Sequence, residues 1–273
     1  MEQSKLISKL HKARKKQIST IFGKVPQKYF SMGLELASGD GFQSELLLDY
    51  IKNFTSSEYN EEDLNNTNAE ITYVGIDAEK LDTSFDAQHF ELIFSSNLLE
   101  HLPDSHSCIS AMHTVLKDSG ICVQVMPNPS WKIGKLLLFY PNLIISLPRR
   151  LFRKLFSTKQ AQIKPEKTRI NNPKLIDSKL GRLRRLFIPG VHGVSRGNMI
   201  EIADFRKQRW INEFEQNGFK IIHILKGPFF IGELSHRANE ILEKMGFTTE
   251  YIYIAVKEGQ APDVTERYKS MFR

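Results

Sequence analysis

The sequence has few of the features that mark secreted, metal-rich or membrane-spanning proteins. Its two cysteines, Cys108 and Cys122, show neither metal-type nor redox-type spacing. Both lie in apolar surroundings, which favours reduced core thiols and a reducing compartment. The basic N-terminus lacks the apolar run and cleavage site of a secretory signal. The apolar stretch 132–156 is too short and too interrupted by proline to span a bilayer. We therefore predict a cytoplasmic protein with no metal ligands.

Composition places the chain among ordinary globular proteins. Hydrophobic residues make up 41% and charged residues 25% of its 273 residues, which is enough for one elaborated domain with a buried core. The net charge of +7 is unevenly spread, because residues 149–190 hold thirteen Lys or Arg and only two acidic residues. This segment is either a solvated loop or a contact surface for phosphate, nucleic acid or an anionic bilayer.

Strand-like and helix-like segments alternate through much of the chain. The predicted strands are 33–37, 54–58, 71–77, 90–96, 121–127, 220–227 and 250–256. The predicted helices are a basic amphipathic one over 1–28, then 42–54, 108–116 and 198–219, the last ended by Gly218. Alternation of this kind indicates an α/β protein with a parallel sheet wrapped by helices. Trp210 and Phe214 are spaced one helical turn apart and are expected in the core.

A turn of small residues, Ala37 to Gly41, joins the first predicted strand to a helix. Glycines allow a tight turn and expose backbone N–H groups, so a ligand can approach the backbone there. Acids follow at successive strand ends, with Glu58 after the second strand and Asp77 after the third. Glu58 lies 17 residues beyond Gly41, close to the separation of about 20 at which an acid meets ribose hydroxyls in dinucleotide folds. The pattern indicates a nucleotide-type site.

Five stretches together resemble the class I S-adenosylmethionine-dependent methyltransferases of type 11. They are LELASGDGFQSELL, SSEYN, YVGIDAEKL, FELIFSSNLLEHLPD and VLKDSGICVQVMPNP, between Leu34 and Pro129. The resemblance implies a Rossmann-like, seven-stranded, mostly parallel sheet with helices on both faces. It also implies S-adenosylmethionine as cofactor and S-adenosylhomocysteine as product. One departure is Ala37, which stands where the family usually has glycine; we expect it to be tolerated at a negative φ.

The resemblance assigns cofactor contacts residue by residue. Gly39 and Gly41 would line the methionyl part, Glu58 the ribose, and Asp77 with Ala78 the adenine, while Glu35 would meet the methionyl amine or order the turn. Residues after the fourth strand would flank the sulfonium. The full predicted set is Glu35, Ala37, Gly39, Gly41, Glu58, Asp77, Ala78, Ser95, Ser96 and Asn97.

Candidates for catalysis are fewer. His192 lies in a Gly-rich loop before a late helix and is the candidate for a base or acceptor ligand, against a purely structural role in the loop. Glu100 and His101 are interpreted as structural, because they begin a helix beyond the sulfonium. Arg196, Arg206 and Arg209 would bind a phosphate or carboxylate of the acceptor, or simply face solvent.

The predicted organisation is one sheet domain with additions. It consists of a basic N-terminal helix (1–28), a cofactor-binding core (29–130), a basic and apolar helical insertion (131–190) before the last two strands, and the rest of the sheet (191–273). The insertion is expected to cap the acceptor site or to lie on the inner membrane face, which favours a lipid-linked or glycan acceptor. An RNA methyltransferase and a non-catalytic interaction module stay open as alternatives.

Overall fold

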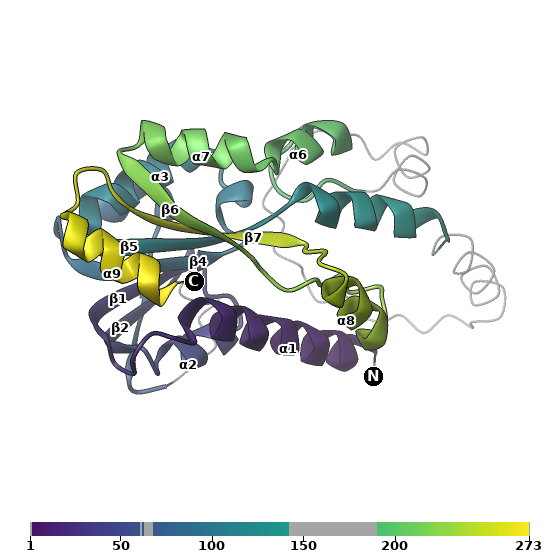
Figure 1. The fold of residues 1–273 in the computed structure, drawn as a ribbon, viewed down its shortest axis with the longest axis horizontal. Coiled ribbons are helices and arrows are strands. Elements are labelled where there is room, and N and C mark those ends of the chain that lie inside the picture. Colours follow the sequence, from purple (N-terminus) through teal and green to yellow (C-terminus); the bar gives the residue numbers. More distant parts are fainter. Residues whose placement is uncertain (1, 61, 63–67, 142–189, 273) are drawn as a thin grey trace.

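The computed structural model describes residues 2–60, 62, 68–141 and 190–272 (Figure 1). Most of the predicted insertion, including its basic cluster Arg149, Arg150, Arg153 and Lys154, lies outside the described residues. Its described beginning is helical over residues 129–141. Among the described helices, none is both long enough and apolar enough to cross a bilayer.

A single seven-stranded sheet forms the centre, in the order β3-β2-β1-β4-β5-β7-β6. The strands are β1 (Phe30–Leu36), β2 (Ile51–Glu58), β3 (Ile71–Gly75), β4 (Phe90–Ser96), β5 (Leu116–Pro127), β6 (Phe219–Lys226) and β7 (Glu250–Lys257). All neighbours are parallel except that β7 runs antiparallel to both β5 and β6. The predicted fold class is confirmed.

Helices cover both faces of this sheet (Figure 1). One face is packed by α3 (Ser105–Val115) and α7 (Lys207–Gln216), and the other by α1 (Glu2–Phe22), α2 (Phe42–Leu47) and α9 (Pro262–Met271). Side chains of a strand point to its two faces in turn, and β7 shows this clearly. On β7, Ile252 and Ile254 face the α1 side while Tyr253 faces the α3 side. Trp210 and Phe214 of α7 are fully buried, as predicted.

Several predicted boundaries are wrong for tertiary reasons. The predicted helix 42–54 stops at Leu47, because Ile51 and Phe54 belong to β2 and pack against the α1 side. The predicted helix 198–219 is two helices, α6 (Asn198–Asp204) and α7, broken at Arg206, whose backbone is extended. The N-terminal helix ends at Phe22. Both α8 (His236–Lys244) and α9 were not predicted.

Candidate active site

The turn after β1 brings the chain back on itself with three left-handed residues. Their φ angles are +55° at Ala37, +63° at Gly39 and +71° at Gly41. The expectation of a negative φ at Ala37 is therefore wrong. The Ala37 backbone is left-handed, a conformation that costs an L-residue about 1–2 kcal/mol because its Cβ crowds the following carbonyl oxygen. A Cβ added at Gly39 would meet nothing within 4 Å, so the space above this turn is open.

Glu58 lies at the end of β2, directly beside the glycine turn. Its carboxylate accepts a hydrogen bond from the backbone N–H of Gly39. The neighbouring backbone is tied down as well, since Ser38 N–H donates to the Ser57 carbonyl at 3.0 Å. Parallel pairing of β1 with β2 produces this proximity, because the carboxyl ends of both strands meet at one edge.

Glu35 is a buried carboxyl group beneath the turn. Only 2% of the residue is exposed, and Ser44 Oγ donates a hydrogen bond to its Oε2. Burial raises the pKa of Glu35 to about 7, since a charged carboxylate loses its hydration inside the protein. Its one described side-chain partner is the Ser44 hydroxyl at the start of α2, so its position beneath the glycine turn is set by that contact.

The ends of β3 and β4 carry the remaining predicted cofactor residues. Asp77 accepts a hydrogen bond from Glu79 N–H at 3.1 Å and caps the 3-10 helix η2 (Ala78–Thr83). Asn97 has a φ of +56° and lines a cavity together with Ser96. Ser95, by contrast, is 1% exposed and donates to Gln124 within the sheet.

A cavity of about 250 Å³ lies beside these strand ends, and α1 forms one wall of it. Gln17 of α1 donates to Glu250 Oε1 at 2.7 Å and accepts from Gln43, so it links α1 to β7 and α2. Arg14 pairs with Asp40 of the glycine turn at 2.6 Å. Burial raises the pKa of Glu250 to about 7.

The sequence prediction missed these contributors to the cavity. The signal was a polar one: residues 10, 14, 17 and 21 share one face of α1 by their spacing, and Arg14 and Gln17 interrupt an otherwise apolar stripe. No comparable local signal marks Glu250, which only the sheet topology brings to the site.

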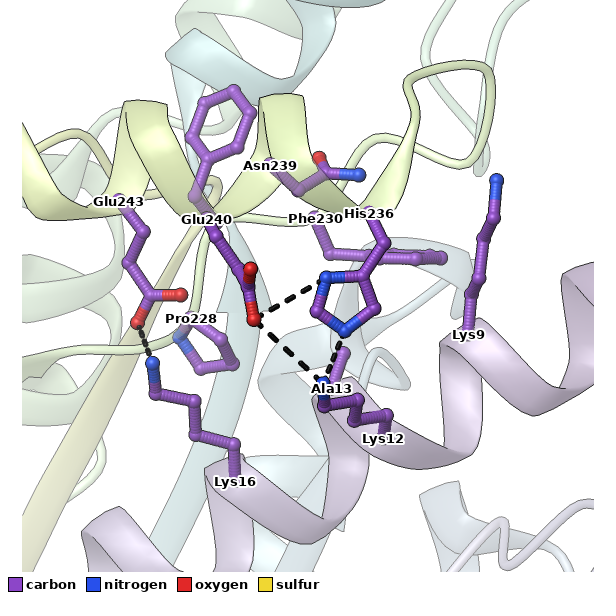
Figure 2. A pocket seen from close by; sticks show the side chains of 11 residues that line it. Lys9, Lys12, Ala13, Lys16, Pro228, Phe230, His236, Asn239, Glu240 and Glu243 are labelled. Atoms are coloured by element: carbon purple, nitrogen blue, oxygen red, sulfur yellow. Dashed lines mark hydrogen bonds and ion pairs between the residues drawn. The ribbon is translucent and has the colours of Figure 1, made fainter.

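Lys12 and Lys16 of α1 contact charged and polar side chains of α8 (Figure 2). Lys16 pairs with Glu243 at 2.5 Å, and Lys12 lies 3.6 Å from Glu240 and contacts His236. Figure 2 shows these side chains meeting across the seam between the two helices. Most of these groups are at least half exposed, so each pair contributes only a fraction of a kcal/mol, roughly 0.2–1. Together they hold α1 in the position in which it walls the cavity.

His192 lies at the cavity with the pair that follows β4. Its Nε2 is 3.1 Å from Nε2 of His101, and Trp131 packs against its ring at 4.7 Å between centroids. Burial, with nearby cationic groups, lowers the pKa of His192 to about 4, so the imidazole is neutral at pH 7. His101 belongs to the 3-10 helix η3 (Leu99–His101), and its pKa is also lowered by burial.

Two charged residues hold the His192 loop in place. Glu201 of α6 accepts a hydrogen bond from the backbone N–H of His192 at 2.7 Å. Lys132 pairs with Glu201 at 2.5 Å and donates to the Gly190 carbonyl at 2.9 Å. The side chains of Lys132 and Glu201 are only 3% and 0% exposed. His192 is therefore positioned by a buried ion pair.

The three predicted acceptor arginines do not line the cavity. Arg196 and Arg206 are exposed. Arg209 stacks on Trp210 and lies 3.4 Å from Glu213 on its own helix. The structure thus brings His192 to the cavity and leaves these arginines elsewhere.

Residues 34–124 match the family described as a methyltransferase domain. The matched segment is similar to a methyltransferase domain. It spans β1 to the middle of β5 and so includes the glycine turn and the ends of β2, β3 and β4. No curated protein matches the sequence.

Solved structures of low sequence identity share the methyltransferase fold. The partner of the Trm112 methyltransferase activator in a Haloferax volcanii complex has a TM-score of 0.54 at 10% identity, covering 92% of this chain and 94% of that one. A Listeria monocytogenes protein assigned to the S-adenosylmethionine-dependent methyltransferases has a TM-score of 0.53 at 14% identity, with coverages of 90% and 98%. A geranyl diphosphate methyltransferase in complex with S-adenosylmethionine has a TM-score of 0.51 at 10% identity, with coverages of 93% and 89%. These likenesses establish the fold.

Proposed function

We propose that this protein is a methyltransferase that uses S-adenosylmethionine. The observation that carries the proposal is the open glycine turn with an acid at the end of the neighbouring strand. Gly39 leaves open space above the turn, its N–H holds the Glu58 carboxylate beside that space, and Asp77 follows at the end of the next strand. These residues fit a ligand with a ribose and an amino-acid part, because carboxylates accept bonds from hydroxyls and amines.

The chain's own residues supply binding, alignment and exclusion of water. Glu58 would accept the ribose hydroxyls, Asp77 with Ala78 would bound the adenine, and Glu35 would order the turn. When bound, S-adenosylmethionine offers a sulfonium methyl group; the acceptor's lone pair forms the new bond to its carbon as the C–S electron pair stays with sulfur. Such an in-line displacement depends mainly on orientation in a dry site. His192 lines the cavity and would contact the acceptor there, as a base or as a ligand.

The proposed methyl acceptor is an amphiphilic molecule, either lipid-linked or a glycan, that would be methylated at the cytoplasmic face of the membrane. The described start of the insertion supports this, since Leu137 and Tyr140 are 70% and 52% exposed on helix 129–141 beside the cavity residue Trp131. Exposed apolar side chains next to a basic segment are typical of interfacial helices. An RNA acceptor is the alternative that the basic segment also permits.

Titration calorimetry with S-adenosylmethionine tests the cofactor site. Gly39→Val and Asp77→Ala should each weaken binding at least about tenfold, near 1.4 kcal/mol, and Glu58→Ala should act likewise. Asp82→Ala is the matched control, because Asp82 is an exposed acid on the same 3-10 helix as Ala78. Thermal unfolding verifies that each variant is folded. Unchanged affinity in all three site variants would refute the assignment.

Incubation of cell fractions with methyl-labelled S-adenosylmethionine tests the acceptor. Label entering the lipid or glycan fraction supports the amphiphilic acceptor, and label entering RNA replaces it with the alternative. Cofactor binding without label transfer to any fraction would instead indicate a non-catalytic module.

A further inference from the structure

Three potential metal ligands meet at the cavity wall, two from the chain after β4 and one from the distant His192 loop. The Nε2 atoms of His101 and His192 are 3.1 Å apart, and Glu100 Oε1 is 3.8 Å from His101 Nε2. One ligand atom from each of the three residues lies within 4.8 Å of the others. His101 and His192 are 91 positions apart in the sequence, so no local spacing of ligands was present from which a metal site could be predicted.

Backbone contacts fix the two stretches against each other. Val194 N–H donates to the Glu100 carbonyl at 3.3 Å. A Cβ added at Gly193, whose φ is +83°, would lie 2.2 Å from that same carbonyl oxygen, so only glycine allows the approach. With Glu201 holding His192 N–H, the imidazole has little freedom to leave His101. Ligands on a rigid support are what a metal site requires.

We propose that Glu100, His101 and His192 bind a divalent cation of the Zn²⁺ class. Two imidazoles and one carboxylate are a known catalytic zinc ligand set that leaves a fourth position open. Two Zn–N bonds of about 2.0–2.1 Å at a tetrahedral angle place the nitrogens roughly 3.3 Å apart. The Nε2 pair, at 3.1 Å, is already close to that separation.

Glu100 is what distinguishes this site from a simple pair of histidines. A hydrogen bond between two neutral imidazoles would account for the 3.1 Å contact, but not for Glu100. Its side chain is 1% exposed, and neither carboxylate oxygen has a hydrogen-bond partner among the other residues that the structure describes. Burying a carboxylate without a partner is costly. A cation between the three residues would supply the missing partner.

The open coordination position faces the cavity that His101 and His192 line. Resting on the proposed function, the open position would take an oxygen of the methyl acceptor, which points to a hydroxyl or carboxylate acceptor.

Metal titration of the full chain tests the site without any reaction. Zn²⁺ in calorimetry and Co²⁺ in visible absorption should bind at one equivalent per chain. Losing an outer-shell partner typically costs 10–100-fold in affinity, so losing a ligand in His101→Ala or His192→Ala should cost at least about 100-fold. Glu100→Gln keeps the side chain's shape and should also weaken binding. His106→Ala is the control, because His106 is an exposed histidine on α3 that contacts Asn217.

The same samples separate this inference from the proposed function. Zn²⁺ should raise the thermal unfolding midpoint of the wild type and of His106→Ala, but not that of the ligand variants. A cooperative unfolding transition in each ligand variant without Zn²⁺ shows that it folds. Zn²⁺ binding with no binding of S-adenosylmethionine would support the metal site and overturn the proposed function. Absence of stoichiometric Zn²⁺ and Co²⁺ binding, or equal affinity in wild type and ligand variants, would overturn the metal site.

Discussion

Replacing Lys132 with Met tests whether the buried ion pair behind His192 holds the loop in place. Lys132 contacts Glu201 at 2.5 Å and the Gly190 carbonyl at 2.9 Å. The methionine side chain is of similar length and apolar, so packing on helix 129–141 is largely retained. What is lost is the positive charge opposite a fully buried carboxylate.

The expected cost follows from that burial. Removing one partner of a buried ion pair leaves the other charge uncompensated and typically costs about 3–5 kcal/mol. Glu201 keeps only the His192 N–H as a hydrogen-bond donor among the described contacts of its side chain. At roughly 2–4 °C per kcal/mol for a chain of this size, the unfolding midpoint should fall by about 6–20 °C.

Urea unfolding of a double-mutant cycle measures the pair itself. Lys132→Met/Glu201→Gln should recover at least about 2 kcal/mol of the loss, because the carboxylate is then absent and the glutamine oxygen can still accept from His192 N–H. Lys135→Met is the matched control on the same helix. Its partner Glu233 is 36% exposed, like Lys135 itself, so this change should cost less than about 1 kcal/mol.

The reasoning fails if Lys132→Met loses less than about 1 kcal/mol, or if the double variant equals the sum of the single ones. In either case Glu201 would be solvated or held by other groups, and the loop would not depend on the pair.

Three further changes probe the cofactor edge and α1. Since the folded pKa of Glu35 is raised to about 7 from 4.5, the stability it contributes is full below pH 4.5 and is lost as pH rises through 7. The free energy of unfolding of Glu35→Gln should therefore rise relative to that of the wild type as the pH increases through 7. In urea unfolding at pH 8 the variant should be more stable by about 1–3 kcal/mol, and a pH-independent difference would contradict this. Ala37→Gly should raise stability by about 0.5–1 kcal/mol by removing left-handed strain, and a loss in the same assay would show that the strain is absent. Lys16→Gln, or about 1 M salt, should speed hydrogen exchange in α1 by weakening the pair with Glu243, while unaltered exchange would show that apolar packing alone holds the helix.

Local patterns were enough to predict the central sheet and the strand ends that carry Gly39, Glu58 and Asp77. In a parallel α/β unit, each strand, turn and helix can be predicted from the pattern of neighbouring residues. Parallel pairing then brings the carboxyl ends of successive strands to the same edge of the sheet. The contact between Glu58 and Gly39 is therefore a direct consequence of the order of elements. The sign of φ at Ala37 was mispredicted, because composition does not reveal the path of a turn.

Helix boundaries depended on packing that the sequence pattern does not contain. Phe205 is buried at the end of α6, and the chain leaves the helix at Arg206 before α7 begins. Ile51 and Phe54 are three residues apart, a spacing that favours a helix, yet pairing with β1 places both in β2, where they are buried on the α1 side. Tertiary burial outweighed local propensity at these points, since propensity differences amount to less than about 1 kcal/mol per residue.

Only the tertiary structure decided what surrounds the cavity beside the strand ends. Sequence by itself placed His192 in a loop and treated Glu100 and His101 as scaffold. The antiparallel return of β7 brings Glu250 to Gln17 of α1, 233 residues away, and the loop before α6 brings His192 to His101. These contacts are long-range, and nothing in a local run of residues encodes a partner so distant. The sheet order sets β7 beside β5, and the buried Lys132–Glu201 pair holds the His192 loop through the bond from His192 N–H to Glu201.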